Sequence, residues 1–375
     1  MSNSSKKVTI AIVTPNLKRG GAEKVLVHFA NNINLDIYNL VIFCQRKEGE
    51  LLSEIRSEVQ IVSLEAPRVY FIFFALRRAL KKYKPDVLIG WMGHINAMLA
   101  FLKPFLPSGV VYMCRESSIP SHFIKHYTAP WLFRFLYRFL NRYDGIICQS
   151  EAMKADLVNN FNVKESRIKT IHNPVVMKQG PILPSGISVF LKDAERTLLY
   201  VGRFSGEKRA SLTLEVLEIL PNSYKLIMVG YGPLENEIRS IINQKGLSER
   251  VMIVTDCNNP AAFYERADCL LLTSAFEGFP NVLLEANALG CPVCVYQTEG
   301  GAAEIINKST GIYIAPDSTA GIVDFCQAIE KICTNPAGYS RPDIANYTVE
   351  KFGIREIVKQ YTGFIEAVRT DCVEN

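Results

Sequence analysis

The chain has 375 residues, and at the usual size of about 150 residues per domain this length predicts two domains, each able to bury a core. Hydrophobic residues make up 48% and charged residues 21% of the chain, which excludes disordered and fibrous proteins. The longest apolar run, residues 69–76, is much shorter than the roughly 18 residues that a membrane-spanning helix needs. The ten cysteines lie mostly inside apolar runs, which is typical of reduced cysteines in a cytoplasmic protein.

The net charge of +5 hides a difference between the two halves of the chain. Residues 1–180 carry a net charge of +12, whereas residues 181–375 carry −7. This excess of Lys and Arg in the first half indicates an anionic partner, either a nucleic acid or an acidic membrane surface.

Apolar runs of strand length alternate with amphipathic helical runs along the chain, a pattern that favours parallel α/β sheets covered on both faces. In the first half we expect strands at residues 8–15, 38–44, 59–64, 87–90, 109–114 and 145–149. In the second half we expect strands at residues 197–204, 224–230, 251–255, 269–274, 292–296 and 311–314.

Two such sets of strands predict two doubly wound, Rossmann-like domains. The expected boundaries are residues 1–173 for the first domain, joined by a C-terminal helix at about 352–375, then a linker rich in Pro and Gly at 174–196, and residues 197–351 for the second domain. Doubly wound sheets bind ligands at the carboxyl ends of their strands, so we expect a site in a cleft where the two domains face each other.

The first expected strand is followed by Gly20 and Gly21, and then by a helical pattern. A glycine turn at a helix N-terminus lets backbone N–H groups approach an anion, although such a turn is more often only a structural loop. The G-x-G-x-x-G pattern is absent from this turn, so a nicotinamide dinucleotide is not indicated.

In the second half, Arg203 follows a strand and Lys208 comes five residues later, at the start of the next helical pattern. These two cations are suited to holding a diphosphate without a metal, and the alternative is a pair of solvated basic residues. The next strand ends at Gly230 and Tyr231, within a second glycine turn.

The most informative segment runs from Ser274 to Ala286. Glu277 lies on a turn after a strand, Pro280 is placed to begin a helix, and Glu285 follows on that helix. The two carboxylates are too far apart along the chain to form a glycosidase-like acid and base pair by default.

Taken together and in order, these motifs resemble those of the retaining GT-B glycosyltransferases of family 4. The resemblance extends from about residue 13 to residue 311, and the set is far more specific than any one motif. It implies a GT-B fold, a nucleotide-sugar donor and transfer that keeps the anomeric configuration of the sugar.

The resemblance also assigns roles to residues of the donor site. Arg203 and Lys208 would bind the diphosphate, Glu285 the ribose and Glu277 the donor sugar. The sugar and the diphosphate would further be held by backbone groups of Gly20, Gly21, Gly230, Tyr231, Gly278, Phe279, Pro280 and Asn281.

Two positions depart from the family pattern. Many relatives have a His after a strand of the first domain, near the reacting sugar, and here Glu116 stands in that place, so its role is open. His94 is a second candidate for this part of the site, with a structural role as the alternative. The family's usual glycine after the lysine is Arg209 here, either close to the phosphates or pointing to solvent.

The D-x-D metal signature is absent, so we expect no metal and no cofactor, with Arg203 and Lys208 in the electrostatic role.

Two basic and aromatic segments, residues 69–84 and 131–143, account for much of the positive charge. Arg134, Arg138 and Arg142 have the spacing of one helical stripe, next to Trp131, and such a helix suits a membrane interface. A core helix with a solvated edge is the alternative, and the half-chain charge favours the anionic membrane. Arg115, His122 and Lys125 are further candidates for the acceptor or membrane side.

We therefore expect a metal-independent, retaining glycosyltransferase of the hexosyltransferase class. Its expected donor is a UDP-linked hexose or N-acetylhexosamine, with a guanosine nucleotide as the second choice. Its expected acceptor is a polyprenyl-diphosphate saccharide of O-antigen or capsule assembly, held at the inner face of the cell membrane. A nucleotide-sugar epimerase of the same fold, or a transferase with a soluble acceptor, is the alternative. Nucleic-acid binding is not expected, because no recognition motif is present.

Overall fold

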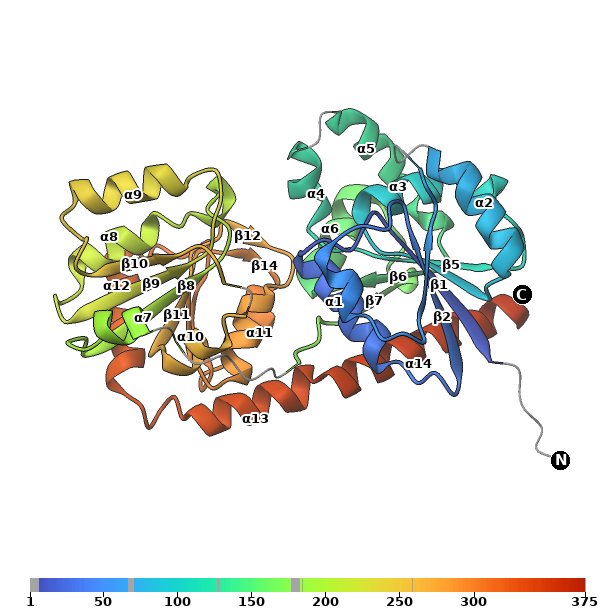
Figure 1. The fold of residues 1–375 in the computed structure, drawn as a ribbon. Helices are drawn as coiled ribbons and strands as arrows, with labels where there is room; N and C mark the ends of the chain where they lie inside the picture. The colour runs from blue at the N-terminus through green and yellow to red at the C-terminus, as the bar shows by residue number, and fades with distance from the viewer. Residues whose placement is uncertain are drawn as a thin grey trace. The chain divides into compact units, whose positions relative to one another are not determined.

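The computed structural model describes residues 7–66, 71–126, 129–176, 183, 185–257 and 259–374. The chain forms two compact units (Figure 1). Unit 1 comprises Met1–Pro174 and Ile354–Asn375, and unit 2 comprises Val175–Gly353.

Unit 1 is built on a seven-stranded parallel sheet with the order β3-β2-β1-β4-β5-β6-β7. Its strands are β1 (Val8–Thr14), β2 (Tyr38–Cys44), β3 (Gln60–Ser63), β4 (Val87–Gly90), β5 (Val111–Arg115), β6 (Gly145–Cys148) and β7 (Ile168–Thr170). Successive residues of β1 belong to different core clusters: Ile10 and Ile12 to one, Ala11 and Val13 to the other. Both faces of the sheet are therefore covered, as near-continuous apolar strands require.

Helices cover the two faces of this sheet (Figure 1). They are α1 (Gly21–Asn32), α2 (Ile72–Tyr83), α3 (Gly93–Leu102), α4 (Pro120–Phe123), α5 (Pro130–Tyr137), α6 (Glu151–Phe161) and α14 (Ile354–Glu374). Short 3₁₀ turns are η1 (Glu50–Glu54), η3 (Lys103–Phe105), η4 (Ile124–His126), η5 (Leu140–Arg142) and η6 (Glu165–Arg167). The long α14 returns from the end of unit 2 to pack against α1 and β5.

Unit 2 is built on a six-stranded parallel sheet with the order β10-β9-β8-β11-β13-β15, accompanied by a two-strand pair of β12 and β14. The strands are β8 (Arg196–Val201), β9 (Tyr224–Val229), β10 (Val251–Val254), β11 (Cys269–Leu272), β12 (Phe276–Glu277), β13 (Val293–Tyr296), β14 (Glu299–Gly300) and β15 (Gly311–Ile314). The helices are α7 (Ser185–Phe190), α8 (Leu212–Ile219), α9 (Glu235–Gln244), α10 (Ala261–Arg266), α11 (Asn281–Ala288), α12 (Ile322–Thr334) and α13 (Arg341–Phe352), with 3₁₀ turns η7 (Gly206–Lys208) and η8 (Gly301–Glu304).

The two doubly wound sheets confirm the predicted fold class, and each of the twelve expected strands has a counterpart. The sequence prediction missed β7 and the short β12 and β14. Residues 174–196, the expected linker, contain α7 and the first residue of β8, and they belong almost entirely to unit 2. Within the described residues, no helix is long and apolar enough to cross a membrane.

Candidate active site

In unit 2 the strand order reverses between β8 and β11. From β8 the chain continues to β9 and β10 on one side of this point, and from β11 it continues to β13 and β15 on the other side. The loops after β8 and β11 therefore diverge and leave room for a ligand. The predicted donor residues Arg203 and Lys208 follow β8, and Glu277 follows β11. The carboxyl edge of the sheet thus collects residues that are 69 positions apart in sequence.

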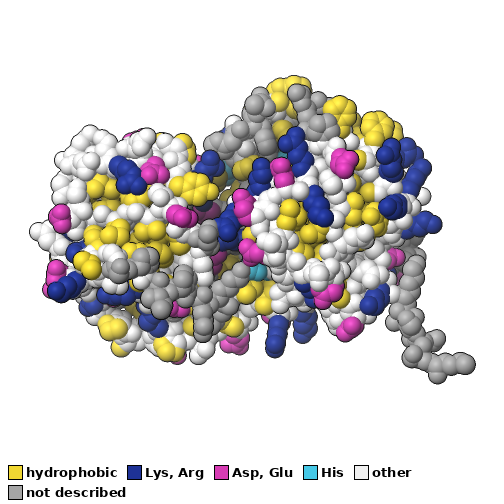
Figure 2. Space-filling model, viewed as in Figure 1, with side chains coloured by type: hydrophobic (Ala, Val, Ile, Leu, Met, Phe, Trp, Pro, Cys, Tyr) yellow, Lys and Arg dark blue, Asp and Glu magenta, His cyan; other side chains and the backbone are white. Residues whose placement is uncertain are grey.

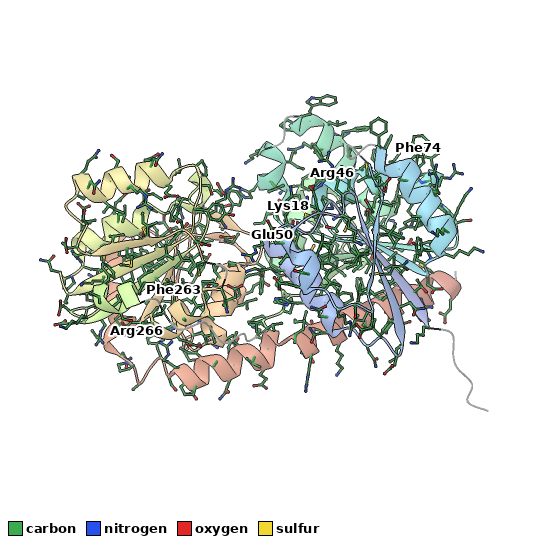
Figure 3. The ribbon with its side chains drawn as sticks, in the orientation of Figure 1. Lys18, Arg46, Glu50, Phe74, Phe263 and Arg266 are labelled. Carbon is green, nitrogen blue, oxygen red and sulfur yellow. The ribbon has the colours of Figure 1, made fainter. Side chains whose placement is uncertain are left out.

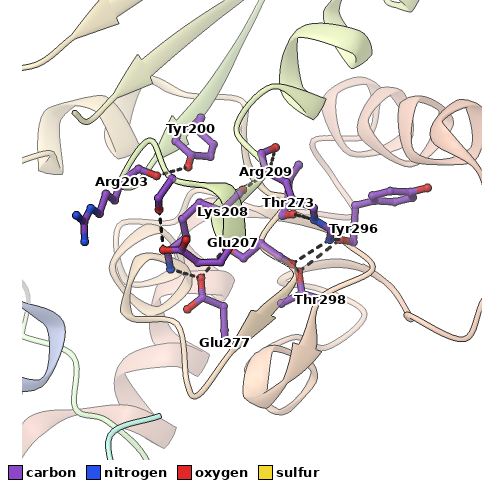
Figure 4. A network of polar contacts seen from close by, with 11 residues as sticks. Tyr200, Arg203, Glu207, Lys208, Arg209, Thr273, Glu277, Tyr296 and Thr298 are labelled. Carbon is purple, nitrogen blue, oxygen red and sulfur yellow. Dashed lines mark hydrogen bonds and ion pairs between the residues drawn. The ribbon is translucent and has the colours of Figure 1, made fainter. Parts of the chain in front are cut away.

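An ion pair joins Lys208 and Glu277 at this edge, with Nζ 2.6 Å from Oε1 (Figure 4). Ser274 donates its hydroxyl to the same carboxylate oxygen at 2.7 Å. The side chains of Lys208 and Glu277 are 27% and 14% exposed, so the pair is held in place but remains accessible. Because a single Lys208 N–H satisfies Glu277, the other ammonium donors can serve an anionic ligand.

Arg203 is exposed on the loop after β8, and in Figure 4 its guanidinium points away from the Lys208 network. Its backbone carbonyl accepts a hydrogen bond from Tyr200 at 3.2 Å, which fixes the loop without engaging the charge. Burial raises the pKa of Tyr200 well above its usual value, with further contributions from Glu277 and Glu207, so this phenol stays a donor. Arg203 and Lys208 therefore present two cations at one edge.

Arg209 does not point to solvent, which was one of the two positions that the sequence suggested. Its guanidinium donates to four backbone carbonyls, those of Thr273 (2.6 Å), Ser274 (3.0 Å), Tyr296 (3.1 Å) and Gln297 (2.9 Å). The single O–H of Thr273 is shared between the carbonyls of Lys208 and Arg209, at 3.1 and 3.0 Å. The Arg209 side chain therefore points inward and ties the loop that carries Lys208 to the ends of β11 and β13.

The loop after β9 packs tightly on the loop after β8. Gly230 has a φ of +157°, and a Cβ atom there would lie 1.9 Å from the Gly202 carbonyl oxygen. The Phe204 amide donates to the Tyr231 carbonyl at 3.0 Å, and the Tyr231 side chain is 68% exposed. Glycine is required here because any side chain would separate the two loops.

The segment after Glu277 begins helix α11 as the sequence predicts. Pro280 is the N-cap residue, and Asn281 is the first residue of the helix. Phe279 is buried against Phe352, with ring centroids 5.8 Å apart, and Pro280 is buried too, whereas Glu277, Gly278 and Asn281 are half-buried.

Glu285 lies one turn into the same helix and is half-buried. Its Oε2 accepts a hydrogen bond from Tyr264 at 3.1 Å. Sequence reasoning did not identify Tyr264 or Ser274 as partners of these carboxylates, because nothing in a single sequence relates a hydroxyl to a carboxylate on another element.

In unit 1 the strand order reverses between β1 and β4. Gly20 is the N-cap of α1, and a Cβ atom there would lie 2.2 Å from Oε2 of Glu23, so the glycine makes room for this carboxylate. Burial raises the pKa of Glu23. Trp91, after β4, donates its indole N–H to the Ala22 carbonyl at 2.9 Å. The expected Gly20 and Gly21 turn therefore lies at the carboxyl edge of this sheet.

The structure contradicts an acceptor or membrane contact for Arg115, which is completely buried. Its Nε donates to the Tyr361 hydroxyl at 2.8 Å, its Nη2 donates to Asn173 Oδ1 at 2.6 Å, and its guanidinium lies 4.8 Å from the Trp91 ring centroid. The side chain turns inward because its partners lie inside unit 1: Tyr361 on α14, Asn173 after β7 and Trp91 after β4.

Glu116 is also completely buried. Its two carboxylate oxygens accept hydrogen bonds from Asn96 Nδ2 at 2.8 Å and from the Tyr137 hydroxyl at 3.0 Å. Burial raises its pKa to about 7, against the lowering effect of these hydrogen bonds and of Arg115. His94, the second residue of α3, is half-buried, and burial lowers its pKa.

The expected single stripe of three arginines is wrong, because α5 ends at Tyr137. Arg134 and Arg138 are exposed, whereas Arg142 lies in η5 and donates to the carbonyls of Ala100 and Phe101. Its guanidinium also lies 4.3 Å from the Phe139 ring centroid. Arg142 therefore stabilises the fold and does not extend the cationic surface.

The other acceptor-side candidates lie near the surface of unit 1. Trp131 on α5 is 73% exposed, Lys125 on η4 is exposed, and His122 on α4 is half-buried. Residues 69 and 70 of the first basic and aromatic segment, 69–84, lie outside the described residues. In the part of the chain that the structure describes, no group of three or more His, Cys, Asp or Glu residues could hold a metal ion.

Comparisons with known proteins agree with this arrangement. Residues 19–179 match the family model "Glycosyltransferase Family 4", and residues 188–351 match "Glycosyl transferases group 1". The chain is 28% identical over 291 residues, 74% of this chain and 76% of the relative, to the GalNAc-alpha-(1->4)-GalNAc-alpha-(1->3)-diNAcBac-PP-undecaprenol alpha-1,4-N-acetyl-D-galactosaminyltransferase of Campylobacter jejuni. It is 25% identical over 298 residues, 74% of this chain and 78% of the relative, to the capsular polysaccharide biosynthesis glycosyltransferase CapH of Staphylococcus aureus.

Among solved structures, Anabaena HepE in complex with UDP has the same fold. The TM-score is 0.78 at 17% sequence identity, covering 96% of this chain and 100% of that chain. Because the two family models follow one another along the chain and together cover most of it, the protein belongs to the GT-B glycosyltransferases of group 1 and family 4.

Proposed function

We propose that this glycosyltransferase moves a hexose or N-acetylhexosamine from a UDP sugar to a membrane-held polyprenyl-diphosphate saccharide in surface polysaccharide assembly, with retention and without a metal. The observation that carries the donor half is the cationic edge of unit 2, where Arg203 is exposed and Lys208 is held by Glu277. The UDP bound in the HepE crystal structure supports the nucleotide. The name of the Campylobacter relative supports the lipid-linked acceptor, and the name of CapH supports a role in surface polysaccharide assembly.

The chemistry requires stabilisation of negative charge on the leaving diphosphate while the sugar passes through an oxocarbenium-like state. Cations that are already in position when charge develops stabilise the transition state more than the ground state. Lys208 is positioned in this way. The ion pair with Glu277 fixes its side chain, and the hydrogen bonds of Arg209 and Thr273 fix its loop. Glu277 would then serve both as the partner of Lys208 and, through its second oxygen, as a contact for the donor sugar.

The acceptor half rests on a surface of unit 1 that combines aromatic and basic side chains. Trp131 and Phe74 are 73% and 70% exposed, and Phe105 is 61% exposed. Figure 3 shows Phe74 at the outer side of α2, and Figure 2 shows hydrophobic side chains over α5 and α2 with Lys and Arg beside them. Exposed basic residues on α2, η4 and α5, or directly after α2 and α5, are Arg77, Arg78, Lys81, Lys82, Lys84, Lys125, Arg134 and Arg138. Aromatic rings with adjacent cations match the interface of an anionic membrane.

The decisive experiment offers a panel of UDP and GDP sugars to the full-length protein together with a membrane lipid extract, and measures release of the nucleoside diphosphate and a labelled lipid product. We expect release of UDP from one sugar nucleotide, dependent on the extract. Release that depends equally on a soluble saccharide would contradict the lipid acceptor. Conversion of the donor into an isomeric sugar nucleotide without acceptor would favour the epimerase alternative.

A further inference from the structure

Glu116 is fixed from several directions at the end of β5. Its amide donates to the Ile147 carbonyl at 2.9 Å, and its carbonyl accepts from Gln149 Nε2 at 2.8 Å. Its side-chain oxygens accept from Asn96 on α3 and from Tyr137 on α5. Both of its oxygens are engaged and the side chain has no exposed surface, so a positioning role fits this carboxylate better than the role of a general base.

Tyr137 links this carboxylate to the surface of unit 1. It is the last residue of α5, it is 3% exposed, and its ring lies 5.0 Å from that of Phe161. The same helix carries the exposed Trp131 and Arg134. One end of α5 is thus anchored at the sheet edge, while its outer side carries the residues that we assign to the acceptor and membrane surface.

Gly93 provides the space for this contact. It is the first residue of α3, and a Cβ atom there would lie 2.6 Å from the Tyr137 hydroxyl oxygen and 3.0 Å from Glu116 Oε2. The next Tyr137 atom is 3.9 Å away. A Cβ atom there would therefore strike the Tyr137 hydroxyl oxygen, and because this oxygen moves only with its ring, either the Tyr137 side chain shifts away from Glu116 or the start of α3 moves.

We propose that Glu116 and Tyr137, with the space left by Gly93, form a positioning contact that holds α5 against the carboxyl edge of the unit 1 sheet and so sets where the acceptor is bound. Glu116 is on this account a positioning residue and not a general base. The inference rests on the proposed function, because it assigns α5 to the acceptor. Small displacements of a positioning element are costly, since the acceptor hydroxyl must meet the donor carbon within a narrow range of distance and angle.

The test uses four variants of the full chain: Gly93→Ala, Tyr137→Phe, their double variant and Glu116→Gln. Gly363→Ala is the matched control, because a Cβ atom at this helical glycine of unit 1 meets nothing within 4 Å. Hydrogen–deuterium exchange of the amides in residues 130–137 reports on α5 without substrate. We expect these amides to exchange about fivefold faster in Gly93→Ala and in Tyr137→Phe, because the loss of roughly one net hydrogen bond changes an opening equilibrium by about this factor. The control should show no change.

The double variant separates contact from general damage. Removing the Tyr137 hydroxyl also removes the atom that the methyl group introduced by Gly93→Ala would strike, so the double variant should exchange like Tyr137→Phe alone. Fully additive effects, or an unchanged α5 in Gly93→Ala, would overturn the contact. A Gly93→Ala protein with faster exchange throughout unit 1 would also overturn it, since the effect would then be unfolding and not release of α5.

Transfer assays test the role of this contact in the reaction. They use the lipid extract together with the sugar nucleotide from which the panel experiment detects release of UDP. We expect Gly93→Ala and Tyr137→Phe to raise the extract concentration at half-maximal rate, with a maximal rate within about tenfold of the wild type. Glu116→Gln should keep activity within the same range across pH, because the amide can still bond to Tyr137 and Asn96. A loss of more than about 100-fold in Glu116→Gln, the effect of removing a general base, would overturn the positioning role.

The two failures are distinguishable. A wild-type protein that transfers no sugar with any donor and extract contradicts the proposed function before a variant is compared. An active wild type whose Gly93→Ala and Tyr137→Phe variants keep the wild-type extract dependence contradicts the positioning contact alone.

Discussion

Lys208 and Glu277 come from loops on either side of the point where the unit 2 strand order reverses, and their ion pair defines the candidate donor site. Exposed ion pairs contribute little to stability, so the value of this half-buried pair lies in orientation. The long, flexible side chain of Lys208 is held at one place at the carboxyl end of the sheet, on the loop that also carries the exposed Arg203.

Replacing Lys208 by Ala should reduce transfer by about 100-fold or more, because one fixed cation is lost where charge develops on the leaving group. Release of nucleoside diphosphate at saturating donor and extract measures this effect. Lys331→Ala, which removes an exposed lysine of the same unit, should leave the rate unchanged. Near-normal turnover in Lys208→Ala would reject this residue as a part of the site.

Arg209 makes a different contribution, since its guanidinium satisfies four backbone carbonyls. Arg209→Ala should lower the free energy of unfolding by about 2–4 kcal/mol, because charged hydrogen bonds to partly buried carbonyls are lost together. A shift of the urea midpoint to lower concentration measures the loss. An Arg209→Ala variant as stable as the wild type would show that these four hydrogen bonds do not stabilise the fold.

The buried carboxyl of Glu116 makes stability depend on pH. Its pKa rises from 4.5 to about 7 on folding, so between these values the folded chain keeps a proton that the unfolded chain releases. Stability therefore falls as pH rises through this window. Glu116→Gln removes the titrating group. The urea midpoint of this variant, relative to that of the wild type, should therefore increase as the pH rises from about 5 to about 8. A difference that is constant over this range would contradict the assigned environment.

At the scale of elements, helix α5 shows what a single sequence can and cannot reveal. Its aromatic and basic pattern predicts an interfacial helix, and Trp131, Arg134 and Arg138 are exposed as expected. The pattern also suggests one continuous helix through Arg142, but the helix ends at Tyr137, where its side chain turns inward to Glu116. Helical spacing alone does not show where such a tertiary contact ends a helix.

Charge reversal at Arg134 and Arg138 should release the protein from anionic vesicles, since each basic residue near such a surface contributes about 1 kcal/mol. Arg142 is left unchanged, because its hydrogen bonds to Ala100 and Phe101 hold the fold. Cosedimentation with vesicles of phosphatidylserine and phosphatidylcholine measures binding, and charge reversal at Arg239 and Arg266 of unit 2 is the control. Unchanged sedimentation of the α5 variant would remove the membrane surface from the account.

Other elements were missed for local reasons. β7 is only three residues long and contains the exposed Lys169, so it has no apolar run. α7 lies in a stretch whose prolines and glycines favour a linker. Arg115 follows the strand expected at residues 109–114, where a charged residue usually faces solvent, but it is the last residue of β5 and its partner Tyr361 lies 246 residues away. A contact over that sequence distance leaves no signal in spacing.

At the scale of the whole molecule, the alternation of apolar and amphipathic runs was sufficient to predict two doubly wound units, because that pattern has few other solutions. The placement of the candidate donor motifs at the carboxyl ends of strands was predictable because each motif follows an expected strand, and parallel strands bring their carboxyl ends to one side of the sheet. The partners that fix them, such as Ser274 and Arg209, were not, since their contacts depend on how loops pack.

The charge difference between the two halves follows the same division. The basic first half supplies most of unit 1, with its exposed Lys and Arg, and the acidic second half supplies most of unit 2. An excess of positive charge confined to one unit favours an anionic partner for that unit.

The central claim is that Arg203 and Lys208, and not a divalent metal, stabilise the departing nucleotide. It is tested most directly by single-turnover transfer from the donor to the lipid extract in excess EDTA, for the wild type and for the Arg203→Ala, Lys208→Ala double variant. We predict a wild-type rate that EDTA does not change, and a rate in the double variant that is lower by at least about 100-fold and is not restored by Mg²⁺ or Mn²⁺. Loss of the wild-type rate in EDTA with recovery on adding metal, or a double variant as fast as the wild type, would contradict it.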